Sequence, residues 1–334
     1  MDKGNKPPRE KVLEMTMGLA ISRCIYAAAK LGIADHLTGG EMSCDTLAKD
    51  TGTHPGSLYR LMRALASVGM FSETDPGRFR LTPEAECLKR DVPGSLREFI
   101  LLRGEEEFAP WEEVVHTVKT GESAFEKVYG SNRAEYLKEN PKAAERYNRA
   151  MAGISAGGNN EAVMNACDFS GIRRLVLVGG DQSILFGAIL QKYPDMEGVL
   201  MDMGETGDAV LRKQGLGSRY TFIKDDFLAS VPPSADAYLT GLVHALTHDN
   251  AVRLLKNCYD AMPEKSLVFA VERMIAPETP WRVSLADMNM LIMTGGGIRT
   301  KDEFSRLFRE AGFQKPDIIS TGSVMSVIRA EKQS

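Results

Sequence analysis

Residues 175–190 read Leu-Val-Leu-Val-Gly-Gly-Asp-Gln-Ser-Ile-Leu-Phe-Gly-Ala-Ile-Leu, and this stretch decides the fold. Its first four residues form a continuous apolar run, which is typical of a strand buried on both faces of a parallel sheet. Gly179 and Gly180 then permit a sharp turn and a close approach to a ligand. An amphipathic helix follows, and Asp202 stands at the end of the next apolar run. This order predicts a nucleotide-type cofactor site at the carboxyl end of a sheet.

From residue 166 onward the sequence alternates between strand and helix patterns. The candidate strands are 175–178, 198–201, 220–223, 237–242, 266–271, 317–320 and 325–329, and helical patterns cover 250–261 and 301–311. Such alternation predicts an α/β fold, with a mostly parallel sheet that is covered by helices on both faces. Ligands of these sheets bind beyond the carboxyl ends of the strands, where the polar candidates described below also stand.

The N-terminal region has the pattern of a winged helix. Apolar residues at helical spacing predict one helix over 12–37, which Gly32 helps to end. Two shorter helices are expected at 43–49 and 57–68, and Pro55 is suited to opening the second. A hairpin is expected from 70–73 and 78–82 around a turn at Asp75-Pro-Gly.

A winged helix is often a DNA reader, but the charges of this one argue against that role. Residues 41–90 contain seven Lys and Arg residues and seven Asp and Glu residues, so the segment has no basic footprint. A DNA-binding surface needs one to displace counterions from the phosphates. We therefore expect a structural or dimerisation role for this region.

The middle of the chain, 95–165, is expected to be helical. It offers several large side chains that can line a pocket: Trp111, Phe125, Tyr129, Tyr136 and Met151. Ala156-Gly-Gly-Asn-Asn predicts a bend between domains. The resulting division is a winged-helix dimerisation domain at 1–100, a helical connector lining the substrate pocket at 101–165, and an α/β domain at 166–334.

The bulk properties are those of an ordinary globular protein. The 334 residues are 43% hydrophobic and 26% charged, with a net charge of −4 that gives no general attraction to nucleic acid or anionic membranes. We find no apolar run near the about 18 residues that span a bilayer, and no signal-peptide core at the N-terminus. The five scattered cysteines favour free thiols in a reducing, cytoplasmic setting.

Acidic residues follow the second and third predicted strands. Asp202 is placed to accept hydrogen bonds from ribose hydroxyls, and Asp225 and Asp226 are placed to meet an adenine amino group. Each alone has a plain alternative, because an Asp after a strand commonly caps a helix. Their joint order favours a nucleoside-type site.

His244 is expected to end the fourth strand and to face the cofactor, as a general base that titrates near neutrality. Glu272 ends the fifth strand and is a candidate to orient the imidazole, by the logic of a catalytic triad. The alternatives are a structural histidine and an ion pair between Glu272 and Arg273. His248 also follows His244 by four residues, but the spacing lacks a metal-binding motif, and 249–250 looks like a helix cap, so we expect no metal.

Further segments carry a resemblance that covers nearly the whole chain. They are Tyr26-Ala-Ala-Ala-Lys-Leu-Gly-Ile-Ala-Asp, Thr53-His-Pro-Gly-Ser-Leu-Tyr-Arg-Leu-Met-Arg-Ala-Leu-Ala, Gly77-Arg-Phe-Arg-Leu-Thr-Pro, Tyr147-Asn-Arg-Ala-Met, Asp287-Met-Asn-Met-Leu and Thr294-Gly-Gly-Gly-Ile-Arg-Thr-Lys-Asp-Glu-Phe. In these the chain resembles the dimeric S-adenosylmethionine-dependent O-methyltransferases of secondary metabolism. The resemblance implies a Rossmann-like class I methyltransferase domain behind a mostly helical winged-helix dimerisation domain. It also implies a homodimer.

The resemblance assigns roles to particular residues. S-adenosylmethionine is the implied cofactor, and its implied contacts are Gly179, Gly180, Asp181, Asp202, Asp225, Asp226 and Phe227. His244 is the implied general base, although its Asp and Trp neighbours in the family motif are here Ala245 and Leu246. Of two flanking acids in the family, Glu272 matches the first, and Ile298 replaces the second.

The cofactor loop departs from the family pattern, acid-x-Gly-Gly-Gly-x-Gly. The leading acid is Leu177, the third glycine is Asp181 and the last glycine is Ser183. The latter two substitutions are expected to put side chains in the path of the cofactor, and Asp181 adds a negative charge near its carboxylate.

Three functions remain open at this point. The first is an O-methyltransferase that acts on a hydroxyl of a small natural product. The second is a non-methylating enzyme on the same scaffold, catalysing cyclisation, rearrangement, elimination or hydroxylation, with weakened or lost cofactor binding. The third, a dimeric regulatory protein, has little support from the retained histidine and acid. Fold alone does not separate these functions.

Overall fold

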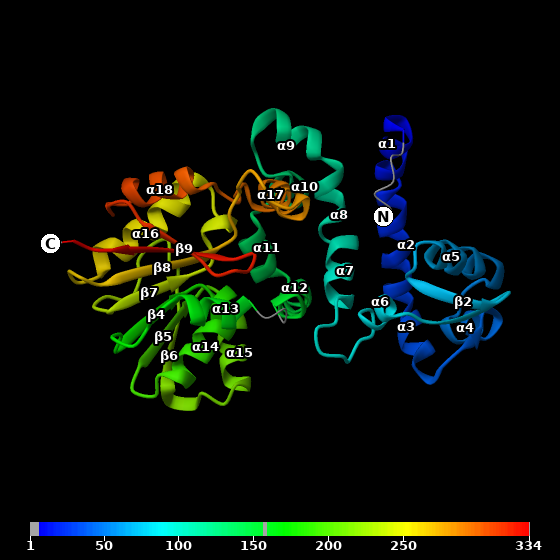
Figure 1. Cartoon of the computed structure of the whole chain (residues 1–334), viewed down its shortest axis with the longest axis horizontal. Helices are drawn as coiled ribbons and strands as arrows, with labels where there is room; N and C mark the ends of the chain where they lie inside the picture. The colour runs from blue at the N-terminus through cyan, green and yellow to red at the C-terminus, as the bar shows by residue number, and fades with distance from the viewer. Residues whose placement is uncertain (1–6, 156–158, 334) are drawn as a thin grey trace. The chain divides into compact units, whose positions relative to one another are not determined.

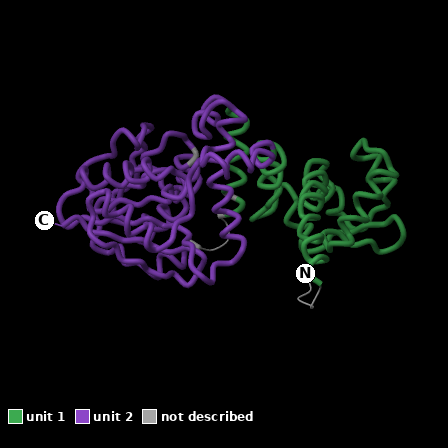
Figure 2. Tube along the Cα trace, turned by 90° about the horizontal axis from the view of Figure 1, so that it is seen from above, with its two compact units in different colours: residues 1–108, 140–157 green, residues 109–139, 158–334 purple. Residues whose placement is uncertain are grey.

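The computed structural model describes residues 7–155 and 159–333, and the chain divides into two compact units (Figures 1 and 2). Unit 1 comprises Met1–Phe108 and Asn140–Gly157, and unit 2 comprises Ala109–Glu139 and Gly158–Ser334. The expected connector at 101–165 is thus shared between the two units. The bend expected from residue 156 starts outside the described residues.

Unit 1 is a helical domain with a small antiparallel sheet. Its helices are α1 (Pro8–Thr16), α2 (Gly18–Leu31), α3 (Ile33–His36), α4 (Cys44–Thr51), α5 (Pro55–Ser67), α6 (Pro83–Glu86), α7 (Arg97–Gly104) and α12 (Pro141–Ser155), with a 3-10 turn η1 (Leu37–Gly39). Its strands are β1 (Met42–Ser43), β2 (Phe71–Asp75) and β3 (Arg78–Leu81), in the order β1-β3-β2. The two helices and the hairpin of the predicted winged helix are confirmed, and Pro55 opens α5 as expected.

The single helix predicted over 12–37 is wrong in detail, because the structure divides this region into α1, α2 and α3. Gly32 ends α2 in the left-handed conformation, at φ +68°, which an L-amino acid adopts only at a cost. The division at Met17 has no such signal, since its backbone stays helical, at φ −68° and ψ −12°. Apolar periodicity continues across both breaks, and the sequence pattern therefore merged them.

Pro8–Leu31 also corrects the expectation that no apolar run is long enough to span a bilayer. By length and composition this stretch passes that test among the described residues, and little of it is buried. Two of its charged side chains, Arg23 and Lys30, are nevertheless bound within unit 1. Arg23 Nη1 donates to the carbonyl of Gly104 at 2.8 Å, and Lys30 Nζ lies 2.6 Å from Glu105 Oε1. These contacts tie α2 to α7 and the residue that follows it.

Unit 2 is built on a seven-stranded sheet. Its helices are α8 (Phe108–Glu112, which begins at the last residue of unit 1), α9 (Val114–Thr120), α10 (Ala124–Tyr129), α11 (Arg133–Glu139), α13 (Asn159–Ala166), α14 (Ser183–Lys192), α15 (Thr206–Lys213), α16 (His248–Ala261), α17 (Trp281–Thr294) and α18 (Lys301–Glu310), with 3-10 turns η2 (Gly180–Gln182), η3 (Gly217–Arg219) and η4 (Val243–Ala245). The strands are β4 (Arg174–Val178), β5 (Glu197–Asp202), β6 (Tyr220–Lys224), β7 (Ala237–Thr240), β8 (Leu267–Glu272), β9 (Asp317–Ser320) and β10 (Ser326–Glu331). All seven predicted strands are therefore present.

The strand order is β6-β5-β4-β7-β8-β10-β9. The first five strands are parallel, and β10 runs antiparallel to both of its neighbours. The carboxyl ends of five strands thus meet at one edge of the sheet, with β4 in the interior. This confirms the Rossmann-like fold, and it brings the loops after β4, β5, β6, β7 and β8 together.

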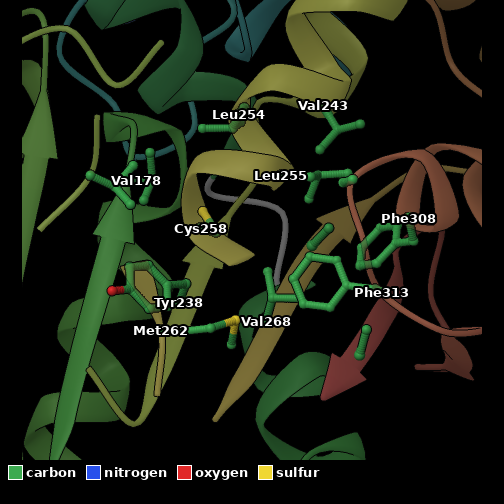
Figure 3. Packing of buried hydrophobic residues seen from close by; sticks show 14 of the residues in the cluster. Val178, Tyr238, Val243, Leu254, Leu255, Cys258, Met262, Val268, Phe308 and Phe313 are labelled. Atoms are coloured by element: carbon green, nitrogen blue, oxygen red, sulfur yellow. The ribbon is translucent and has the colours of Figure 1, made fainter. Parts of the chain in front are cut away.

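Both faces of the sheet are covered, as Figure 1 shows for α14 and α15 on one side and α16 and α18 on the other. Alternate residues of β4 enter different cores: Val176 and Val178 pack on the α16 side, whereas Leu175 and Leu177 pack on the α14 side. Figure 3 shows the first of these cores, in which Val243 lies beside the α16 side chains. Val243 precedes His244, so this core fixes the base of the turn that carries the histidine.

Candidate active site

The turn after β4 has room only for glycine. Gly179 has φ +86°, and a Cβ there would lie 2.2 Å from Cδ1 of Leu242. A Cβ on Gly180 would lie 2.5 Å from Oδ2 of Asp202. The two glycines therefore bring the backbone against the loop after β7 and against the acid at the end of β5.

Backbone N–H groups from two loops surround the carboxylate of Asp202. Burial raises the pKa of Asp202, and backbone N–H groups oppose this by stabilising the carboxylate; they belong to Gly204, Met203, Gly180 and Gly207. The side chain remains partly exposed at the end of β5. A carboxyl group held in this way suits a ligand hydroxyl.

Ser183 and Leu177, two of the three departures from the family pattern, are both buried. Ser183 is 2% exposed, and its Oγ donates to the carbonyl of Gly180 at 2.7 Å. The hydroxyl of Ser183 thus closes the turn internally, on the buried side of the loop. Leu177 is fully buried in the core beneath α14, so this strand position contributes packing in place of a carboxylate.

Asp181, in η2, is exposed and lies in a field of other charges. The surrounding protein desolvates the carboxylate and raises the pKa of Asp181 to about 6, against the attraction of His244. Asp202 and Glu272 raise the pKa further, and Arg133 lowers it. Asp181 thus interacts electrostatically with both the acid after β5 and the histidine after β7.

Asp225 and Asp226 follow β6 and are both exposed. Oδ1 of Asp225 accepts the N–H of Asp226, and Oδ1 of Asp226 accepts the N–H of Leu228, each at 2.8 Å. Phe227 is 7% exposed and packs into the core beside α16. Local turn contacts therefore fix the backbone of this loop, while the carboxylates stay open to solvent.

His244 does not end a strand, as the sequence suggested, but lies in η4, because β7 stops at Thr240. Its Nδ1 is 2.7 Å from Oε2 of Glu272, which is completely buried at the end of β8. An ionised carboxylate only accepts hydrogen bonds, so Nδ1 carries the proton. Nε2 is then the nitrogen that can accept one, on a side chain that is 31% exposed.

Burial and the charges of Glu272 and Asp181 together set the basicity of His244. Burial lowers the pKa of His244, but the charge and hydrogen bond of Glu272, together with the charge of Asp181, raise it more, so that it lies above the usual value. The partner of Glu272 is thus His244 itself, and the alternative of a simple ion pair with Arg273 is not what the structure shows. An imidazole of raised pKa is a stronger base once it is neutral.

Ile298 stands where the second flanking acid was expected by resemblance. Ile298 is 6% exposed, and its N–H donates to Oδ1 of Asp287 at 2.7 Å. The neighbouring Arg299 was not singled out from the sequence, yet it is buried beside η4 and donates to the carbonyls of Val243 and Leu246. Arg299 lies within the family-like segment 294–304, which was a signal for its importance, but the sequence pattern did not indicate that its side chain is buried.

His248, the other candidate near η4, is on the surface. Its Nε2 lies 2.7 Å from Oε2 of Glu310. This exposed pair connects the first residue of α16 with the last residue of α18. The N-cap of α16 is Thr247, whose side chain accepts the N–H of Asn250, rather than residue 249 or 250.

The predicted pocket aromatics fall mostly into one cluster of unit 2. Phe125, Tyr129 and Tyr136 have ring centroids 4.6 to 5.3 Å apart, and Phe125 packs with Ile292 and Met293 of α17. Trp111 packs beside them and donates from Nε1 to Asn289 Oδ1 at 2.9 Å. Met151 lies in α12, which belongs to unit 1.

Comparisons with known proteins agree with this fold. The family model of the O-methyltransferase domain matches residues 111–314, and that of the O-methyltransferase dimerisation domain matches residues 13–91. A phenazine O-methyltransferase from Lysobacter antibioticus is 35% identical over 98% of this chain and 97% of its own. Two-domain methyltransferases are thus the class to which the fold and the site point.

Solved structures give the same answer. A mitomycin 7-O-methyltransferase superposes with a TM-score of 0.92 at 28% identity, covering 97% of each chain. A methyltransferase of calicheamicin biosynthesis, solved in its SAH-bound form, superposes with a TM-score of 0.79 at 28% identity, covering 99% of each. The chain belongs to the O-methyltransferase family. The comparisons give no support to a non-methylating enzyme on this scaffold.

Proposed function

We propose that this protein is an S-adenosylmethionine-dependent O-methyltransferase that acts on a hydroxyl group of a small aromatic natural product. The observation that carries the proposal is the contact between His244 and Glu272. It leaves Nε2 of the imidazole as an open base at the carboxyl edge of the sheet, beside the glycine turn and Asp202.

The loops after β4, β5 and β6 fit the cofactor. A Cβ on Gly180 would lie 2.5 Å from Oδ2 of Asp202, so only glycine lets the backbone of this cradle close against the acid after β5. We assign the cradle to the cofactor through Gly179 and Gly180, the ribose to Asp202, and the adenine to the loop of Asp225, Asp226 and Phe227. Bound S-adenosylmethionine would supply the methyl group on a sulfonium sulfur.

Asp181 is the unusual member of this set. With Asp202 and Glu272 it makes the site strongly acidic, and the described cations that act on it are Arg133 and His244. A sulfonium ligand carries one more positive charge than the thioether left after methyl transfer. We therefore assign Asp181 to favouring the charged cofactor over its product by Coulomb attraction.

His244 acts as the general base on the acceptor hydroxyl. Nε2 would take the proton of the acceptor hydroxyl, and Glu272 would stabilise the imidazolium that forms. The remaining rate enhancement comes from holding oxygen and methyl in line. The aromatic cluster on α10, α11 and α17 is the place for a flat acceptor, because α17 also packs against η4.

We assign the assembly to the N-terminal region, which the dimerisation model matches. Large apolar side chains at the start of the chain are exposed in one copy: Val12, Leu13, Met15, Met17 and Leu19. A homodimer formed through α1 and α2 would bury them. The relatives are methyltransferases of small aromatic compounds by name, and we propose the cytoplasm as the working compartment.

Methyl transfer from isotopically labelled S-adenosylmethionine to a panel of phenols and hydroxylated heteroaromatics tests the proposal. The wild-type chain should label at least one acceptor, and His244→Gln should lower the rate by about 10² to 10⁴-fold. A wild-type rate in His244→Gln would remove the histidine from the mechanism. Cofactor binding without transfer to any acceptor would favour a non-methylating enzyme instead.

A further inference from the structure

Arg299 is a buried arginine whose donors go to backbone carbonyls. The residue is 9% exposed and stands just before Thr300, the N-cap of α18. Its Nη1 donates to the carbonyl of Val243 at 2.6 Å and to that of Gly297 at 3.0 Å, and its Nη2 donates to that of Leu246 at 3.0 Å. Burial lowers the pKa of Arg299, and the charges of Glu272, Glu303 and Asp287 oppose this.

The acceptors of Arg299 flank the histidine on both sides. Val243 precedes His244 and Leu246 follows it by two positions, so one guanidinium holds both ends of the turn. The carbonyl of His244 itself accepts the N–H of Gly297 at 2.9 Å. A Cβ on Gly296 would lie 2.4 Å from that same oxygen. Segment 296–299 is therefore fitted closely against the backbone of η4.

Glu272 binds the backbone N–H groups of the same turn, whereas Arg299 binds its carbonyl groups. Its Oε1 accepts the N–H of Val243 at 2.8 Å and that of His244 at 3.4 Å, while Oε2 takes Nδ1. The N–H groups are thus bound by Glu272 and the carbonyls by Arg299 and Gly297. A short 3-10 turn has few hydrogen bonds of its own, so these two side chains define where His244 lies.

Segment 296–299 is itself held in place by hydrogen bonds to neighbouring elements. Oδ1 of Asp287, on α17, accepts the N–H of Ile298 at 2.7 Å, and the carbonyl of Arg299 accepts the N–H of Ile275 at 3.1 Å. Thr300 then starts α18 with a reciprocal capping box to Glu303. The guanidinium therefore links η4 to α17, α18 and the segment after β8.

We infer that Arg299 is a positioning residue for methyl transfer, which fixes His244 by clamping the backbone carbonyls on either side of it. The inference rests on the proposed function, in which Nε2 of His244 is the base. A misplacement of about 1 Å can cost on the order of 10²-fold in rate. Loss of Arg299 leaves the glycine turn and Asp202 unaltered, and so acts on the turnover rate rather than on cofactor binding.

Arg219 provides a matched control. Its Nη2 also donates to three backbone carbonyls, those of Leu190, Tyr193 and Met196, at 3.0 to 3.2 Å. It stands just before β6 and therefore at the amino edge of the sheet, away from the site. Arg219→Met should lower the melting temperature and leave kcat and the cofactor Kd unchanged, which separates loss of a structural clamp from loss of positioning.

The test compares Arg299→Met, Arg299→Lys and Arg219→Met by calorimetry with S-adenosylmethionine, by kcat, and by NMR of ¹⁵N-histidine-labelled protein. We expect Arg299→Met to bind cofactor within about 3-fold of wild type, to lose on the order of 10²-fold in kcat, and to lose the sharp signal of the His244 Nδ1 proton. Arg299→Lys, which keeps the charge but not the fork, should lose about 10-fold.

Wild-type kcat and an unchanged His244 signal in Arg299→Met would overturn the inference. If Arg299→Met does not fold, the same readouts on Arg299→Lys decide, and wild-type values there overturn it equally. If the wild-type chain transfers no methyl group, the proposed function fails, but the Nδ1 proton still reports whether Arg299 holds the histidine.

Discussion

His244 and Glu272 are bound to each other through both side chain and backbone, although 28 positions separate them. One carboxylate oxygen lies 2.7 Å from Nδ1, and the other accepts the N–H of the same histidine at 3.4 Å. Glu272 thereby sets the tautomer, the basicity and the place of the imidazole at once. The buried end of β8 thus supplies the acid, and the turn after β7 supplies the base.

Replacing this acid should affect chemistry more than cofactor binding. Glu272→Gln keeps the shape but removes the charge that stabilises the imidazolium, so we expect kcat to fall by about 10² to 10⁴-fold. The Kd of S-adenosylmethionine, measured by calorimetry, should stay within a few-fold. A loss of cofactor binding equal to the loss of kcat would show that Glu272 acts on the fold of the site rather than on the base.

The pH profile should depend on Asp181. His244 must be neutral to act as a base, and the negative charge of Asp181 raises the pKa of His244. Asp181→Asn removes that charge, so the rising limb of kcat/KM should move to lower pH. The pKa of Asp181 is about 6, so below that pH the wild-type carboxyl is itself becoming protonated, and the two profiles should converge.

Asp260→Asn is the control for this profile, because Asp260 lies at the exposed end of α16 and pairs with Lys256. Its profile should match wild type. A shift of the Asp181→Asn limb to higher pH, or no shift, would contradict the charge assignment. The same variant should bind S-adenosylmethionine less tightly while changing the Kd of S-adenosylhomocysteine less, since only the sulfonium is attracted by the lost charge.

Gly180→Ala should weaken the cofactor site by steric means. The new Cβ would lie 2.5 Å from Asp202 Oδ2 and push the carboxylate aside. Overpacking of this kind costs about 1–3 kcal/mol, or roughly 5 to 150-fold in Kd. Gly171→Ala, where a Cβ meets nothing within 4 Å, is the matched control. Equal affinities in the two variants would place the cofactor elsewhere.

Leu19→Asp should disrupt the dimer. Leu19 is 64% exposed on α2, and a homodimer through α1 and α2 would bury it. Sedimentation of the wild-type chain should give a dimer, and the variant should sediment as a folded monomer. Val68→Asp changes a residue that is 49% exposed at the end of α5, and it should remain dimeric. A dimeric Leu19→Asp would move the interface away from α2.

The sequence predicted the sheet well because β4 packs on both faces. Val176 and Leu177 enter different cores, and a short apolar run between turn residues is typical of a strand that is buried in this way. The same pattern misplaced the end of β7, because Leu242 and Val243 continue the apolar run, yet they belong to a turn that is buried by its neighbours. Composition alone does not distinguish a buried turn from a buried strand.

The structure brings His244 and Glu272 together, as the sequence led us to expect, but the residues that support them were not predicted. His244 and Glu272 were recognisable because they follow strands and match a family pattern. Arg299 was not, because nothing local distinguishes a buried arginine that binds carbonyls from one in solvent. The internal hydrogen bond of Ser183 was not foreseen either, since the direction of its hydroxyl depends on the turn at Gly180 and not on spacing.

The measurement that tests the central claim most directly is calorimetric titration of the chain with S-adenosylmethionine and S-adenosylhomocysteine, beside Asp202→Ala. We predict one site per chain for each ligand, and loss of both in Asp202→Ala, because Asp202 and the glycine turn form a single cradle. The absence of binding to the wild-type chain at millimolar ligand would contradict the account of this protein as a methyltransferase.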